Sequence, residues 1–258
     1  MIAVTRLFHL LLACLGPLLA APAAAAGLPD TIDAVRPGVV AIGTFQATRR
    51  PPANFLGTGF VVANGQYVVT NAHVVAATLD AANREFFAVF AGRGSEFATR
   101  EATKVEIDLE HDLALLKIKA DPLPALKLGS GLPREGQEIA FTGFPIGVVL
   151  GLYPVTHRGI VSAVTPVAIP SPSAGQLDAN AIHRLGKPYD VLQLDATAYP
   201  GNSGSPVYDP ASGRVVGVIN SVFVKETKEN VLQKPSGISY AIPVEHVRAL
   251  LRKAGVGG

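Results

Sequence analysis

Cysteine is almost absent from this sequence, since Cys14 is the only one in 258 residues. Cys14 lies in an apolar N-terminal segment that we expect to be removed, so the mature chain would have no thiol with which to form a disulfide. The fold must then be stabilised by packing alone. Oxidising compartments permit disulfides without requiring them, and an exported protein without cysteine fits a bacterial envelope better than an animal secretion.

An excess of one charge sign is also missing. The chain has 22 Lys and Arg against 20 Asp and Glu, a net charge of +2. Nucleic-acid binding requires many basic groups facing phosphates, so the composition predicts no nucleic-acid partner. The basic residues that do cluster are interpreted as solvated surface; they are Arg49 and Arg50, and Arg248, Arg252 and Lys253 near the C-terminus.

No apolar run is long enough to cross a membrane as a helix. The longest, residues 7–20, is interrupted by Gly16 and Pro17 before it reaches the ~20 residues that a span needs. Arg6 precedes this run and small residues follow it at 22–26. The pattern predicts a signal peptide over residues 1–26 and export, to the periplasm or, alternatively, to the extracellular space.

A second interpretation of the leader is left open. Residues 11–14, Leu-Leu-Ala-Cys, resemble a bacterial lipoprotein box, which would anchor the chain to a membrane through Cys14. Against this, residues 15–26 stay apolar where a lipoprotein normally turns polar.

Helical periodicity is scarce, and short apolar runs separated by turn residues dominate instead. Helices are expected only at residues 31–35 and at 244–253, the second of which begins after Pro243, a favourable first-turn residue. The runs rich in Val, Ile and Phe predict strands and an all-β sandwich or barrel. They lie at 39–42, 59–62, 67–70, 113–118, 139–144, 159–164, 191–194, 215–219 and 238–242.

Three segments carry residues suited to nucleophilic catalysis. Ser203 lies in Gly-Asn-Ser-Gly at 201–204, where small residues let backbone N–H groups face a common point. His73 follows a β-branched run, and Asp112 precedes an apolar one. A serine hydroxyl needs an imidazole to take its proton and an acceptor to orient that imidazole. Each segment alone has an ordinary explanation, as a turn or a structural histidine, but the three together favour a hydrolase.

The surrounding motifs are similar to those of trypsin-like serine proteases of the HtrA (DegP) type. They extend over nearly the whole mature chain and are listed here in order: Gly-Thr-Gly-Phe-Val-Val at 57–62, Thr-Asn-Ala-His-Val-Val at 70–75, Asp-Leu-Ala-Leu-Leu-Lys-Ile at 112–118, Gly-Phe-Pro-Ile-Gly at 143–147, Gly-Ile-Val-Ser-Ala at 159–163, Asp-Ala at 195–196, Gly-Asn-Ser-Gly at 201–204 and Gly-Ile-Ser-Tyr-Ala-Ile-Pro at 237–243.

This resemblance implies an all-β fold of two perpendicular six-stranded β-barrels followed by a short C-terminal helix. The expected protease domain spans residues 27–258, with the first barrel at about 38–128, the second at about 129–242 and the helix at 244–253. Residues 126–133 would link the barrels. The implied catalytic residues are His73, Asp112 and Ser203, and the implied oxyanion donors are the N–H groups of Gly201 and Ser203. Such a serine endopeptidase cleaves protein or peptide substrates, here in envelope quality control, without metal or cofactor.

Other features set limits on the resemblance. His111, His157, His183 and His246 have no metal-ligand spacing, and His111 would point away from Asp112 along an extended strand, so all four are interpreted as structural or solvent-facing. The chain ends 15 residues after Pro243, so we expect none of the PDZ domains usual in this family and do not carry over its trimer as an expectation.

Specificity and activation are predicted by comparison with other trypsin-like proteases. Thr197 stands where trypsin has its acidic pocket floor, and Asn220 where glutamyl endopeptidases have a pocket histidine. With Ser221, these residues suggest a pocket for small or medium apolar side chains. Asn202 replaces the aspartate that pairs with a new N-terminus in zymogen-activated trypsins, so removal of the leader alone should give a competent enzyme. The alternative to an enzyme is a non-catalytic binding or chaperone-like protein on the same scaffold.

Overall fold

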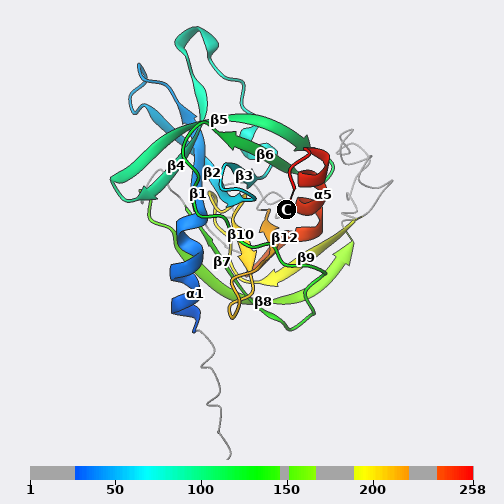
Figure 1. Cartoon of the computed structure of the whole chain (residues 1–258). Coiled ribbons are helices and arrows are strands. Elements are labelled where there is room, and N and C mark those ends of the chain that lie inside the picture. Colours follow the sequence, from blue (N-terminus) through cyan, green and yellow to red (C-terminus); the bar gives the residue numbers. More distant parts are fainter. Residues whose placement is uncertain (1–26, 146–150, 167–188, 221–236, 258) are drawn as a thin grey trace, which may run out of the picture.

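The computed structural model describes residues 27–145, 151–166, 189–220 and 237–257. The predicted signal peptide with Cys14, and also His183 and Ser221, lie outside the described residues. Within them, two closed antiparallel β-barrels of six strands each are followed by a C-terminal helix (Figure 1). The all-β, two-barrel prediction is therefore confirmed.

The two barrels share one connection pattern. The strands of the first are β1 Val39–Phe45, β2 Ala53–Val62, β3 Tyr67–Thr70, β4 Phe86–Arg93, β5 Glu96–Asp108 and β6 Leu113–Ile118. Those of the second are β7 Glu138–Gly143, β8 Val155–Pro166, β9 Asp190–Asp195, β10 Pro206–Tyr208, β11 Val215–Ile219 and β12 Ile238–Pro243. The barrel orders, β1-β2-β3-β6-β5-β4 and β7-β8-β9-β12-β11-β10, match position for position, so the topology repeats although no sequence repeat is evident.

Three strands, β4, β5 and β10, were not among those predicted from the sequence. Most of β5 is exposed and carries charged residues along its length, so it lacks the apolar run on which the prediction depended. β10 has only three residues, too few for a pattern to be recognised. β5 is nevertheless a full member of the first barrel, because it pairs with β4 on one side and β6 on the other.

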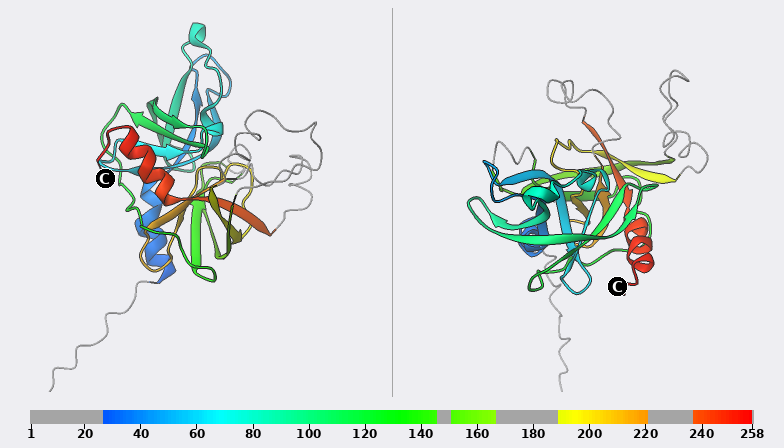
Figure 2. Two further views of the ribbon diagram at one scale, coloured as in Figure 1. Left: turned by 90° about the vertical axis from the view of Figure 1, so that its right-hand side faces the viewer. Right: turned by 90° about the horizontal axis from the view of Figure 1, so that it is seen from above.

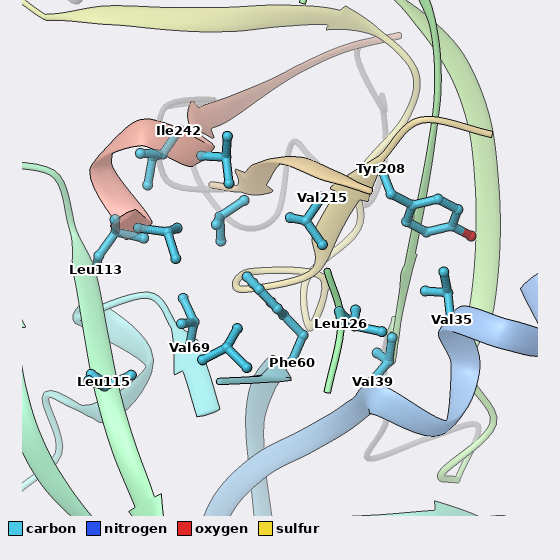
Figure 3. Close-up of a cluster of buried hydrophobic side chains, with 14 of the residues drawn as sticks. Val35, Val39, Phe60, Val69, Leu113, Leu115, Leu126, Tyr208, Val215 and Ile242 are labelled. Carbon is cyan, nitrogen blue, oxygen red and sulfur yellow. The ribbon is translucent and has the colours of Figure 1, made fainter. Parts of the chain in front are cut away.

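The strands near the barrel interface are buried on both faces. Along β6, Leu113 and Leu115 belong to one apolar cluster, whereas Ala114 and Leu116 belong to another. The first cluster includes side chains of both barrels, such as Phe60 of β2 and Ile242 of β12 (Figure 3). Burial on both faces explains why these strands read as continuous hydrophobic runs rather than alternating ones.

Two helices flank the barrels (Figure 2). α1, Leu28–Val35, begins three residues earlier than predicted and buries Val35 in the cluster that contains Tyr208 of β10. α5, Val244–Lys253, continues from β12 of the second barrel and reaches the first, where Lys253 pairs with Glu106 of β5 at 2.9 Å. Within the described residues, no helix is both long and apolar enough to span a bilayer.

Two arginines interpreted as solvated surface are in fact anchored. Arg49 pairs with Glu85 at 2.6 Å, and the hydroxyl of Thr44, this guanidinium and the Asp80 N–H lower the pKa of Glu85 to about 2. Arg248 of α5 donates from Nε to the Gly129 carbonyl at 2.8 Å. The sequence could not indicate these contacts, because both partners lie far from the arginines along the chain.

Candidate active site

His73 and Asp112 meet because their strands are neighbours. His73 opens a 3₁₀ turn, His73–Val75, just after β3, and Asp112 lies just before β6. β3 and β6 are paired, with Thr70 opposite Ala114, so the end of one strand lies beside the start of the other. The Asp112 carboxylate accepts from the backbone N–H of His73 at 2.9 Å, and its second oxygen lies 2.6 Å from His73 Nδ1.

This contact fixes the tautomer of His73. A carboxylate has no proton to donate, so Nδ1 of the imidazole carries the hydrogen and Nε2 remains an acceptor. The side chains of His73 and Asp112 are 32% and 19% exposed, which leaves the imidazole open to solvent and to a ligand. The arrangement suits a group that receives a proton through Nε2.

The sequence suggested that Asp112 lies in an extended strand, but in the structure it lies in a turn. Its φ is +52°, in the left-handed region, which a residue other than glycine seldom adopts. The turn is held because the Asp112 carbonyl accepts from the Ala72 N–H at 3.1 Å and from Asn71 Nδ2 at 3.0 Å. These bonds help to compensate for the backbone strain and keep the carboxylate beneath His73.

Asn220 contributes a further hydrogen bond to the same carboxylate. Its Nδ2 donates to Asp112 Oδ2 at 2.8 Å, and the residue is 1% exposed. The sequence predicts Asn220 in a specificity pocket and gives no indication of this contact across the two barrels. The Asn220 amide thus gives Oδ2 of Asp112 a second donor, besides Nδ1 of His73.

Ser203 lies at the centre of a tight turn between the barrels. Its carbonyl accepts from the N–H of Thr58 on β2 at 2.9 Å. The next residue, Gly204, has φ +87°, and a Cβ there would lie 2.0 Å from the Thr58 carbonyl oxygen. Only glycine therefore fits after Ser203, and the serine is drawn against β2 in the barrel that carries His73.

The backbone of this turn offers two unengaged donors. Asn202 N–H bonds to the Tyr199 carbonyl and Gly204 N–H to the Ile219 carbonyl, both at 3.0 Å. In the described part of the chain, the N–H groups of Gly201 and Ser203 make no hydrogen bond. They are free to donate to an anionic oxygen, which is the role the resemblance implied for them.

The Ser203 hydroxyl is not hydrogen-bonded to His73 in this structure. Ser203 is 7% exposed, and over the described residues its side chain has no hydrogen-bond partner. Catalytic hydrogen bonds are often long in unliganded enzymes and shorten when substrate binds, so the lack of a hydrogen bond between Ser203 and His73 is compatible with catalysis.

The remaining residues of the predicted site are only partly placed. Thr197 is half-buried in the segment after β9, and Ser221 lies outside the described residues. That Thr197, Asn220 and Ser221 line a specificity pocket stays a prediction. Over the described ranges, no three His, Cys, Asp or Glu side chains gather as metal ligands would.

A second histidine–aspartate pair lies beside Asp112. His111 Nδ1 is 2.7 Å from Asp108 Oδ2, and the His111 ring stacks on His246 of α5 with centroids 3.9 Å apart. Tyr189 packs edge-on against both rings. His111 thus joins α5 to the turn that holds Asp112, which is a structural role. The residue lies in a turn and not in the extended strand that the sequence suggested.

Acid should destabilise the fold through His246. Burial, and then the neighbouring His111, lower the pKa of His246 to about 4. Asp108, Glu110 and Glu245 act in the opposite direction. Between an unfolded-state pKa of about 6.5 and this value, the unfolded chain binds a proton that the folded chain does not, so stability falls as the pH drops.

The expected test is urea unfolding of wild type and His246→Gln at pH 8, 6 and 4. Because the ring is partly exposed, we expect the wild type to lose on the order of 1 kcal/mol more than the variant between pH 8 and pH 4. Burial also raises the pKa of Asp108, but the hydrogen bonds from His111 outweigh it and the net pKa is lowered. Asp108 therefore adds a loss in acid that both proteins share, apart from the smallest cause of its lowered pKa, which is His246 itself. Equal pH slopes in the two proteins would contradict the prediction.

Comparison with known proteins also indicates a trypsin-like peptidase. The profile of the trypsin-like peptidase domain matches residues 57–218. The chain is 30% identical over 233 residues to "Serine protease HTRA1" of Xenopus laevis, covering 88% of this chain and 43% of that protein. It is 31% identical over 195 residues to the "Probable periplasmic serine endoprotease DegP-like" of Halomonas elongata, covering 74% of this chain and 33% of the relative.

A solved structure is similar as well. "HtrA-type protease AlgW with tripeptide" superposes with a TM-score of 0.63 at 27% identity, covering 88% of this chain and 63% of that one. The chain spans about two fifths of the length of the first curated relative. The family match covers more than half of the chain, including His73, Asp112 and Ser203. The chain therefore belongs to the trypsin-like peptidase domain family and is similar to proteases of the HtrA type.

Proposed function

We propose that the chain is a serine endopeptidase that hydrolyses peptide bonds in protein substrates. In this proposal His73 is the general base, Asp112 orients it and Ser203 is the nucleophile. The observation that carries the proposal is the double hold of Asp112 on His73, by the backbone N–H at 2.9 Å and Nδ1 at 2.6 Å. Asp108 holds the structural His111 in a similar way, so this hold is taken together with a second contact: Asp112 also accepts from Asn220, which follows Ile219, and the Ile219 carbonyl binds the Gly204 N–H beside Ser203. The held imidazole is thereby linked to the turn that carries the nucleophile, as a general base must be.

The reaction uses groups of this chain alone. Ser203 Oγ attacks the peptide carbonyl while His73 Nε2 takes its proton, and the N–H groups of Gly201 and Ser203 stabilise the oxygen that becomes negative. His73 then returns the proton to the leaving amine, which departs and leaves an acyl ester on Ser203. Water, deprotonated by His73, hydrolyses that ester and restores the serine.

The location and substrates are proposed from the relatives and the leader. The predicted signal peptide at 1–26 and the periplasmic name of the Halomonas elongata relative support export to the bacterial envelope. There the substrates would be misfolded proteins, cleaved after small or medium apolar side chains. Neither Thr197 nor Asn220 carries a charge with which to bind a charged substrate side chain.

Labelling and proteolysis of the chain starting at Gly27 test this function together. We expect a fluorophosphonate probe to modify one serine, identified as Ser203 by mass spectrometry of the digested protein, and unfolded casein to be cleaved without prior processing. The other serines of the chain are internal controls for probe selectivity. Labelling of Ser203 without proteolysis would indicate a closed site.

A non-catalytic binding protein is the second candidate, and one observation favours it. The Ser203 hydroxyl is not hydrogen-bonded to His73 in the resting chain. A scaffold of this kind would show neither labelling of Ser203 nor casein cleavage, and it would retain casein binding. The same two measurements therefore separate the candidates.

A further inference from the structure

A threonine outside the proposed triad occupies the contact between the two barrels. Thr58 of β2 is fully buried, and its side-chain hydroxyl donates to the carbonyl oxygen of Gly201 at 2.7 Å. The same hydroxyl accepts from the N–H of Phe144, just after β7, at 3.0 Å. One side chain of the first barrel thus binds two segments of the second.

We propose that Thr58 is the positioning residue of the oxyanion site, and this inference rests on the proposed function. Gly201 has φ +99°, a conformation that glycine adopts readily. Because glycine has a wide conformational range, its backbone needs restraint from its surroundings. Its N–H is one of the two donors proposed for the negative oxygen. The peptide between Gly201 and Asn202 lies between this donor and the Ser203 N–H, so it must be fixed if the two N–H groups are to converge on one oxygen.

That peptide is held at both ends. Its N–H, on Asn202, bonds to the Tyr199 carbonyl at 3.0 Å within the turn, and its carbonyl, on Gly201, bonds to the Thr58 hydroxyl. The Asn202 side chain gives no further support, since both of its polar atoms are buried and unpartnered in the described part of the molecule. Thr58 therefore supplies the restraint from outside the turn.

The backbone of Thr58 reinforces the same position. Its N–H donates to the Ser203 carbonyl at 2.9 Å, and its carbonyl accepts from the Thr70 hydroxyl at 2.7 Å. Hence Thr58 binds the nucleophile turn on both sides of Asn202, at Gly201 and at Ser203. Thr70 ends β3, three residues before His73, so the same contacts relate the turn to the strand that carries the proposed base.

The Thr58 hydroxyl packs where Gly143 has no side chain. A Cβ on Gly143 would lie 3.0 Å from Thr58 Oγ1, 2.8 Å from Asn202 Oδ1 and 2.0 Å from Ser205 Oγ. The absent side chain of Gly143 therefore leaves space for three oxygens packed behind the nucleophile. Without the Thr58 hydroxyl, the Gly201 carbonyl would be a part-buried acceptor with no partner among the described residues, and the peptide would gain from rotating toward another donor.

The test compares Thr58→Val, which keeps the shape and loses the hydroxyl, with Thr58→Ser, which keeps it. Removing a whole oxyanion donor costs about 10²–10³ in kcat, so misdirecting one should lower kcat in Thr58→Val by about 10–10². KM for a peptide substrate should change little, because the hydroxyl does not contact it. Thr58→Ser should restore kcat to within about threefold of wild type.

The control is Thr44→Val, which removes another buried threonine hydroxyl of the first barrel, one that donates to Glu85 at 2.6 Å. It should lose stability while kcat stays near wild type. Rates are divided by the fraction of sites titrated with fluorophosphonate, so partial unfolding does not count as lost catalysis. If Thr58→Val fails to fold, Thr58→Ala, which also lacks the hydroxyl, takes its place.

The outcomes separate this inference from the proposed function. A wild type that neither labels nor cleaves overturns the proposed function and, with it, this inference. An active wild type with an equally active Thr58→Val overturns the inference alone. So does a loss confined to KM, or a Thr58→Ser variant as defective as Thr58→Val.

Discussion

Ser203→Ala is expected to lower kcat for casein or peptide cleavage by about 10⁶-fold, the size of loss seen when the nucleophile of a catalytic triad is removed. Ser203 lies in the turn that offers the two unengaged N–H groups of Gly201 and Ser203, in the part of the chain that the structure describes. Substrate binding should survive, because the alanine leaves the backbone donors of Gly201 and residue 203 in place. Labelling by a fluorophosphonate should disappear with the activity.

Ser205→Ala is the matched control for this change. Ser205 lies two residues from Ser203 on the same turn, is fully buried, and its hydroxyl has no hydrogen-bond partner within the described residues. Removing it leaves no polar group without a partner, so kcat should stay within about threefold of wild type. Retained activity in Ser203→Ala, or equal losses in the two variants, would exclude Ser203 as the nucleophile.

Burial on both faces favours recognition of a strand but does not guarantee it, since β4 was missed although Phe87 and Val89 lie in one core cluster and Ala88 and Phe90 in the other. β3 and β6 were predicted with their observed bounds because every second residue faces one core and the rest face another. β5 was missed because its side chains are largely exposed, and only its pairing with β4 and β6 makes it a strand. Pairing partners distant in sequence leave no local signal, so the repeated barrel topology was also invisible.

The sequence likewise predicted only part of the candidate active site. His73 and Asp112 were expected together from the motifs around them, and the structure places them in contact at 2.6 Å. Their catalytic roles, and that of Ser203, remain predictions. The positive φ of Asp112 gave no sequence signal, because non-glycine residues adopt it only where surrounding bonds enforce it. Asn220 and Thr58 were missed as supports, since an amide or a hydroxyl has no local pattern that names a partner more than a hundred residues away.

Asp112→Asn should reduce kcat by about 10⁴-fold at neutral pH, the loss found for this substitution in another triad, and KM should change little because the carboxylate does not contact substrate. In the wild type, one oxygen of Asp112 faces the His73 backbone N–H, and the other faces Nδ1 of His73 and Nδ2 of Asn220. The backbone N–H and the Asn220 amide are donors, and the carboxylate makes Nδ1 of His73 a donor by selecting its tautomer. An amide has a single oxygen, so its NH₂ must face a donor on one side or the other.

Both orientations of the amide harm the base. With NH₂ toward the ring, Nδ1 must become the acceptor, so the proton moves to Nε2 and the nitrogen that should receive the serine proton is blocked. With NH₂ toward the backbone, two donors oppose each other at the His73 N–H, a buried mismatch that shifts the turn. Asp108→Asn is the matched control, because Asp108 holds His111 in the same manner, with Nδ1 at 2.7 Å and the backbone N–H at 3.1 Å. That variant should lose stability without losing kcat, measured at pH 8 per titrated site. Equal catalytic losses in the two variants would mean that Asp112 acts through the fold and not through the base.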